Sequence, residues 1–298
     1  MGGSNSSKAL SDCAVPMHTR DFARFVAAVG EQIGTSASDP DQVLAVRRLL
    51  TDALQVEGFV LDCVEIVLDS LSDRTRPWRN PPIFVDAQHD YAIRIIYWPP
   101  RYANNPHEHR RWTVTGNIHN RLDVLTYAWG IPGDVDSLHV ERTIVTQAGE
   151  VGYILPPCVH SVVNPAAMLA ASFHIFSGLT DRDGKDAGAE DFGSSLTTWY
   201  PTPRKGDILR GVRSRALATN IEILERFPGP RSLQLLDETF KSGDARIQLA
   251  SVKAMCRIDV EHAAQRAMTL AEVVPEPARA ELSRIGQQLL AASGAVDN

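Results

Sequence analysis

The sequence predicts a mainly β protein, in which a barrel of short strands lies between a helical N-terminal segment and a helical C-terminal extension. Three observations support this fold class. Between residues 83 and 176, β-branched and aromatic residues form short runs separated by turn residues, a pattern typical of a barrel or sandwich. On both sides of this region, apolar residues recur at helical spacing. A barrel is favoured over a sandwich because closure removes exposed strand edges.

The N-terminal segment, residues 17–75, is expected to be helical. Apolar side chains follow one face of a first helix, with Thr19 as its expected N-cap, and Ser38-Asp39-Pro40 begins a second. Residues 56–69 mix apolar and acidic positions and fit either a short helix or a strand. Residues 1–16 lack such patterns and are expected to form a disordered tail.

The expected barrel occupies residues 76–195. Its strands are rich in β-branched and aromatic residues, and Asn, Pro and Gly residues separate them. The predicted strands are residues 83–85, 91–98, 112–118, 122–129, 138–146, 151–155, 159–163 and 168–176.

The C-terminal extension, residues 205–298, is expected to be helical. Asp244 is a suitable N-cap for a helix with a strong apolar stripe. The helix pair around residues 244–274 resembles a HEAT-type hairpin. These helices could pack on the barrel or on each other, bind a protein partner, or form a homodimer interface, and we favour the packing role.

Composition narrows the function. With 30 basic and 36 acidic residues, the net charge of -6 argues against general nucleic-acid binding. The four cysteines are far apart, which favours reduced thiols in the cytoplasm over a disulfide framework. No apolar run of membrane-spanning length occurs, and the N-terminus does not have the pattern of a signal peptide. We therefore expect a cytoplasmic protein that acts on a small molecule.

The sequence His107-Glu108-His109 predicts a metal site. Residues spaced i, i+2 on a strand face the same side, so both imidazoles would point in one direction. A third histidine, His160, follows a proline-rich turn further along the barrel. Three converging neutral imidazoles suit Fe, Zn, Cu or Ni. The alternative is three unrelated histidines in a β-rich region.

The surroundings of these histidines resemble the two motifs of the cupin superfamily. His107 and His109 match the pair that opens the first motif, and Asn120 stands near its glycine turn. The glutamate of that motif is missing, because Thr113 or Val114 occupies its place. The second motif is matched by Gly152, Pro156, His160 and Asn164. The resemblance implies a double-stranded β-helix barrel that carries a metal inside.

A three-histidine site without the glutamate is similar to the cysteine dioxygenase (thiol dioxygenase) family. The segment from Ser172 to Ser177 resembles that family's Ser-Leu-His-Leu-Tyr-Ser strand. The resemblance implies Fe(II) and O2, with His174 as a partner of the metal site. Two departures concern the substrate: Phe176 replaces the family's tyrosine, and Pro82 replaces its carboxylate-binding arginine. A substrate other than cysteine is therefore expected.

Other arginines could bind a substrate carboxylate. Arg111 lies two residues after His109, so alternation directs it into the barrel if the strand is regular. For Arg94 and Arg101 we favour a solvent-facing position. The predicted catalytic residues are therefore His174 and Arg111.

The leading hypothesis is an Fe(II)- and O2-dependent oxidoreductase that acts on a small thiol or amino-acid-like substrate. Two alternatives remain. One is a non-redox cupin that uses its metal as a Lewis acid, as an isomerase or hydrolase. The other is a regulatory cupin that binds a small ligand.

Overall fold

The computed structural model describes residues 19–35, 38–73, 75, 77–132, 134–178, 197–199 and 208–293. The expected tail, residues 1–16, lies outside this part of the chain. The chain divides into two compact units. The first comprises Met1–Cys63 and Arg79–Arg210, and the second Val64–Trp78 and Gly211–Asn298.

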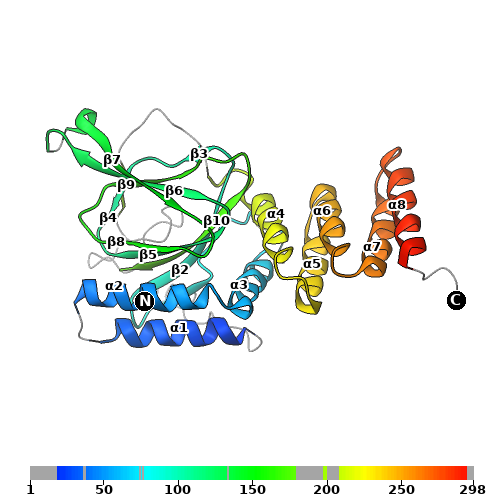
Figure 1. The fold of residues 1–298 in the computed structure, drawn as a ribbon, viewed down its shortest axis with the longest axis horizontal. Helices are drawn as coiled ribbons and strands as arrows, with labels where there is room; N and C mark the ends of the chain where they lie inside the picture. Colours follow the sequence, from blue (N-terminus) through cyan, green and yellow to red (C-terminus); the bar gives the residue numbers. More distant parts are fainter. Residues whose placement is uncertain are drawn as a thin grey trace, which may run out of the picture. The chain divides into compact units, whose positions relative to one another are not determined.

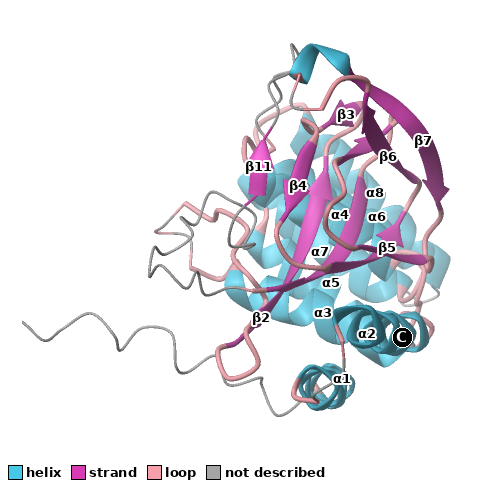
Figure 2. Cartoon of the chain, turned by 90° about the vertical axis from the view of Figure 1, so that its left-hand side faces the viewer, coloured by secondary structure: helices cyan, strands magenta, loops and turns pink. Residues whose placement is uncertain are grey.

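The first unit is built on two antiparallel sheets (Figures 1 and 2). One has the strand order β1-β2-β10-β5-β8, and the other has the order β11-β4-β9-β6-β7, with β3 paired to β9. This arrangement is consistent with the expected cupin-like β fold. The strands are β1 (Phe84–Asp86), β2 (Tyr91–Trp98), β3 (Tyr102–Ala103), β4 (His107–His109), β5 (Thr113–His119), β6 (Leu122–Trp129), β7 (Leu138–Thr146), β8 (Val151–Ile154), β9 (His160–Asn164), β10 (Ala170–Ser177) and β11 (Thr197–Trp199).

Each of the eight predicted strands has a counterpart in the structure. The sequence did not predict β3 and β11, and it indicated β4 only through the spacing of His107 and His109; these strands contain two or three residues each. A strand this short contains too few residues for alternation to be recognised.

Three helices precede the sheets: α1 (Arg20–Ile33), α2 (Asp39–Ala53) and α3 (Glu57–Ser70). Helix α3 resolves the ambiguous segment 56–69. All residues from Phe59 to Val64 are buried. The sequence therefore does not show the one-sided apolar stripe from which an amphipathic helix is predicted.

Hydrogen bonds connect α3 to the N-terminus of α1. Thr19 is the N-cap residue, as expected, but its side chain makes no capping hydrogen bond. The buried carboxylate of Asp62 on α3 accepts instead from the backbone N–H groups of Asp21 and Phe22, each over 2.9 Å. A side chain distant in sequence therefore satisfies two of the free N–H groups of the helix.

The outer face of the five-stranded sheet is covered by aromatic packing. Phe173 of β10 lies 5.8 Å from Phe25 of α1 and 5.6 Å from Phe59 of α3, measured between ring centroids. Helix α2 lies against β5 and β8 (Figure 1), with Leu50 and Leu54 over Gly116. Because alternate residues face opposite sides, the neighbours of Phe173 point into the barrel.

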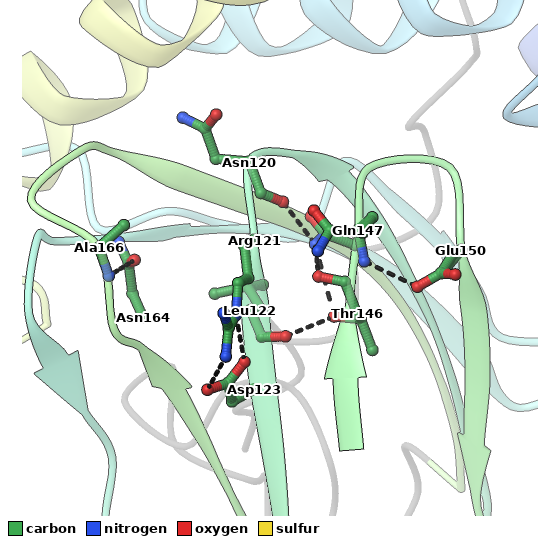
Figure 3. A network of polar contacts seen from close by, with 10 residues as sticks. Asn120, Arg121, Leu122, Asp123, Thr146, Gln147, Glu150, Asn164 and Ala166 are labelled. Carbon is green, nitrogen blue, oxygen red and sulfur yellow. Dashed lines mark hydrogen bonds and ion pairs between the residues drawn. The ribbon is translucent and has the colours of Figure 1, made fainter. Parts of the chain in front are cut away.

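The turns at one end of the barrel are held by side chains (Figure 3). Asn120 adopts a left-handed conformation, with φ of 57°, and its Nδ2 donates to Leu169 O over 2.5 Å. Thr146 Oγ1 donates to Leu122 O over 2.8 Å, and Asn164 Oδ1 accepts from Ala166 N–H over 3.1 Å. These contacts fix the strand ends that carry the cavity walls.

The second unit contains a series of helices, and each helix contacts the next one along the chain. Asp244 caps α6 as predicted, because its carboxylate accepts from the N–H groups of Arg246 and Ile247. The HEAT-like character of these helices stays a prediction. They are α4 (Val212–Leu224), α5 (Pro230–Ser242), α6 (Ala245–Met255), α7 (Val260–Val273) and α8 (Ala278–Ser293).

The structure bears on two expectations from composition, the state of the cysteines and the presence of a membrane-spanning segment. Cys63, Cys158 and Cys256 are free thiols. Among the helices that the structure describes, none has the length and apolar character that a membrane crossing requires.

Candidate metal centre

Three histidines meet inside the first unit. His107 and His109 come from β4, and His160 begins β9, where it lies directly across from His107 in the antiparallel pair. All three are buried, with exposed fractions of 4–6%. The i, i+2 spacing therefore places two imidazoles on one side of a strand, and strand pairing brings the third beside them.

The three side chains form a compact cluster. One ligand atom from each lies within 4.8 Å of the others. The ring centroid of His107 lies 4.2 Å from that of His160 and 5.0 Å from that of His109. The separation of His109 and His160 is also 5.0 Å. Nitrogen atoms at these distances can bind one metal ion together.

Backbone carbonyl groups orient two of the rings. His107 Nδ1 lies 3.0 Å from Asn105 O, and His160 Nδ1 lies 3.2 Å from Cys158 O. A carbonyl oxygen can only accept, so Nδ1 carries the proton in each ring. The lone pair of a neutral imidazole is then on Nε2. Such a contact from the other ring nitrogen is the usual support of a histidine that binds a metal.

Burial keeps the cluster uncharged. Desolvation lowers the pKa of His109 to about 3 and that of His160 to about 4. It also holds the pKa of His107 well below its usual range, with further contributions from the charges of His160 and His109. Three neutral imidazoles at neutral pH are the form that binds a metal. The donor set therefore fits Fe, Zn, Cu or Ni.

The histidines open into a cavity of about 110 Å³. Its wall is largely uncharged, and Glu150 is the only acidic residue among those that line it in the described part of the chain. The carboxylate of Glu150 already accepts from Gln147 N–H over 2.7 Å. The polar side chains that line the cavity include Asn104, Thr113, Thr115, Asn117, Thr146, Ser172 and His174.

His174 lies in a chain of hydrogen bonds at this wall. Trp98 Nε1 donates to Ser172 Oγ over 2.7 Å, and Ser172 Oγ lies 2.7 Å from His174 Nε2. On its other side, His174 Nδ1 lies 3.0 Å from Thr115 Oγ1. Both ring nitrogens thus have hydroxyl partners. Burial is the main reason that the pKa of His174 falls to about 3, with smaller contributions from His109, His160 and Arg94.

Phe176 separates His174 from the cluster. Its ring stacks on His174 with centroids 5.4 Å apart and lies 5.7 Å from the ring of His109. A phenyl ring offers no hydrogen-bonding group at this point, where the resembled family has a tyrosine. The structure therefore places an apolar surface next to the three imidazoles.

Asn117 presents an unused acceptor at the cavity wall. Its Nδ2 donates to Asn120 O over 2.6 Å and to Thr146 O over 3.2 Å. Both partners can only accept, so the amide cannot be flipped. Asn117 Oδ1 is buried and has no hydrogen-bond donor. A ligand with an N–H or O–H group matches this oxygen.

The inward orientation expected for Arg111 is wrong. Strand β4 ends at His109, so the alternation on which the expectation depended does not continue to residue 111. The side chain of Arg111 is 51% exposed, and Nη1 lies 3.8 Å from Asp39 Oδ2 on α2. Arg101 is also exposed, and for this residue a position at the surface was expected.

The solvent-facing position expected for Arg94 is wrong. Arg94 is only 4% exposed and pairs in register with His174 across β2 and β10. The sequence contained one signal for this position: Arg94 interrupts an apolar strand in which all eight residues are buried. A charge within such a run is unusual, because burial of a charged group is costly.

No protein-family model matches this chain, and no curated protein matches it. Solved structures give local matches. An oxalate oxidase structure has 22% identity and a TM-score of 0.23, covering 28% of this chain and 40% of that one. Bacillus subtilis oxalate decarboxylase, described with Mn(II) centres, has 19% identity and a TM-score of 0.27, covering 37% of this chain and 24% of that one. TM-scores this low do not establish a shared activity.

Proposed function

We propose that the protein is a non-haem Fe(II)- and O2-dependent oxidoreductase of the cysteine dioxygenase-like cupin type, acting on a small thiol or amino-acid-like substrate. The observation that carries the proposal is the cluster of His107, His109 and His160, buried beside a cavity and without a carboxylate ligand. Three protein ligands leave positions for a substrate and for O2 on one metal ion.

The chain's own residues would prepare this reaction by holding the metal ion in place and by excluding water from its ligands. The three imidazoles hold the ion, and bound Fe(II) supplies the ability to activate O2. Phe176 and the apolar wall keep water away from the ligands. His174, fixed between Ser172 and Thr115, lies at the same wall and can exchange a proton through the hydroxyl groups on either side.

The cavity also supports a small, polar substrate. The cavity, with a volume of about 110 Å³, has room for a small molecule beside the three histidines. The unpaired Oδ1 of Asn117 requires a donor, such as the amino group of an amino-acid-like molecule. These features support the substrate class without identifying one compound.

The test is metal content followed by oxygen uptake. We expect the purified protein to bind about one Fe(II) per chain, and we expect His107→Ala and His160→Ala each to abolish that binding while the fold is retained. His139→Ala is the matched control, because His139 is exposed on β7. Elemental analysis measures the metal, and circular dichroism checks the fold.

Iron retained at full occupancy in His107→Ala would contradict the assignment of the ligands. The loaded protein should consume O2 with at least one member of a panel of thiols and amino acids. Tight Zn binding with an activity that proceeds without O2 would contradict the oxidoreductase and support the non-redox alternative.

A further inference from the structure

The cavity at the metal centre has its mouth on one side of the barrel. Most of the residues that line it are buried. In the described part of the chain, the exposed lining residues belong to β7, to β8 or to the turn between them, and they are Ile144, Glu150, Gly152 and Tyr153. Strand β8 ends one sheet and β7 ends the other. The mouth therefore lies at the seam between the two sheets.

Gly152 leaves a notch in this mouth. It pairs in register with Thr115 of β5, and register partners project from the same face of a sheet, so a side chain at residue 152 would point into the cavity. Tyr153 points to the opposite face, where Arg47 Cζ on α2 lies 5.9 Å from the centroid of its ring. A Cβ atom at residue 152 would meet no heavy atom within 4 Å. The space beside Gly152 is thus open.

The notch leads towards the metal centre. Thr115 is the one residue of β5 that is not fully buried, although β5 lies between β10 and β8 in the sheet. Its hydroxyl lies 3.0 Å from His174 Nδ1. Gly152 and the three clustered histidines line the same cavity. A ligand that passes Gly152 therefore has a continuous path to the imidazoles.

Hydrogen bonds fix the rim of the notch. Arg47 Nε on α2 donates to Val151 O over 3.0 Å, which anchors the start of β8. In the turn between β7 and β8, Glu150 N–H donates to Gln147 O over 3.0 Å, and Gln147 N–H donates to the Glu150 carboxylate over 2.7 Å (Figure 3). Because the backbone is held in this way, a side chain added at residue 152 would occupy the notch.

We propose that Gly152 forms the entrance through which the substrate reaches the three histidines, and that its missing side chain determines which ligands can pass. A larger residue would close the entrance, because protein walls are packed closely enough to leave few gaps. The proposal rests on the proposed function only for the identity of the ligand. Access of a small probe to the histidines does not require the metal.

The experiment uses the full-length protein without metal and diethyl pyrocarbonate, a small reagent that attacks neutral imidazoles. Burial keeps the clustered histidines neutral at neutral pH, so their modification depends on access. Peptide mass spectrometry measures the rate at which His107, His109 and His160 are modified. His139, which is exposed on β7, is the reference in the same molecule.

Gly152→Phe tests the residue directly. We expect modification of the three histidines to slow by about tenfold relative to His139, because the reagent would then need a transient local opening of the wall. Gly152→Ala should slow it less. Ile144→Ala removes part of the other rim and should accelerate it. Val145→Phe is the matched control, because Val145 is exposed on β7 but does not line the cavity; the rate should stay as in the parent.

Equal rates in the parent and in Gly152→Phe would overturn the inference, and so would a slower rate in Ile144→Ala. Circular dichroism checks the fold. If Gly152→Phe does not fold, Gly152→Val decides by the same criterion, because valine is favoured in strands. Metal content is measured separately. A parent protein that holds no iron, but whose histidines are shielded by the substitution at Gly152, would contradict the proposed function and leave this inference intact.

Discussion

Ser172 connects two buried side chains, the indole of Trp98 and the imidazole of His174. Its hydroxyl accepts from Trp98 Nε1 and lies within hydrogen-bonding distance of His174 Nε2. Removing it takes the hydroxyl partner from a buried indole N–H and from one imidazole nitrogen. The hydroxyl of Ser172 is therefore one of the two that hold the imidazole of His174.

We expect Ser172→Ala to lower the free energy of unfolding by about 1–3 kcal/mol, the usual cost of leaving buried polar groups unpaired. Ser177→Ala is the control on the same strand. The hydroxyl of Ser177 donates to Trp112 O, which also accepts from Ser177 N–H, so no group is left without a partner. Urea denaturation of both variants measures the difference, and equal midpoints would contradict the role given to Ser172.

Arg94 and Arg111 show that the alternation of side chains applies only as far as a strand extends. Alternation holds along β2, which is eight residues long, and it directs Arg94 inward with Ile96 and Trp98. It does not reach Arg111, because β4 contains three residues. The sequence alone does not show where a strand ends, so the two arginines exchanged their expected positions.

At the scale of elements, helix α1 is anchored by a residue of another helix. Asp62 is buried on α3 and accepts from two N–H groups in the first turn of α1. A carboxylate at a helix N-terminus also interacts favourably with the helix dipole. This contact fixes the direction in which α1 crosses the outer aromatic layer of the sheet.

We predict that Asp62→Ala destabilises α1 by about 2 kcal/mol, which combines a lost cap with two unpaired N–H groups. Amide hydrogen exchange of residues 20–33 measures the effect, and their protection should fall. Ser38→Ala is the control, because Ser38 is the N-cap of α2 but makes no capping hydrogen bond to the backbone. Similar protection of α1 in the parent and in Asp62→Ala would refute the anchoring role.

At the scale of the whole molecule, the buried histidines link stability to pH. An unfolded histidine has a pKa of about 6.5, whereas those of His109 and His174 are about 3 and that of His160 is about 4 in the folded protein. Between these values the unfolded chain binds more protons than the folded one. The stability of the metal-free protein therefore falls as pH decreases through this window.

We expect the urea midpoint of the metal-free protein to decrease steadily from about pH 6.5 towards pH 4. His160→Gln removes one of the titrating groups and should make this decrease shallower. A midpoint that does not change across the window would show that the histidines are not held neutral by the fold.

The sequence by itself determined the β-rich centre, its helical flanks, eight of the strands and the spacing of His107 and His109. These features depend on local periodicity and turn residues, which a single sequence displays. Asp244 as a cap and Asn120 in a left-handed turn were predictable for the same reason, since each acts through its own backbone neighbourhood.

Only the tertiary structure decided which distant residues meet. The register of β4 with β9 brings His160 beside His107, and the pairing of β2 with β10 places Arg94 beside His174. The cap of α1 by Asp62 and the free oxygen of Asn117 likewise depend on contacts between separate elements. Such contacts are set by packing and strand register, which combine information from the whole chain, so no local pattern reveals them.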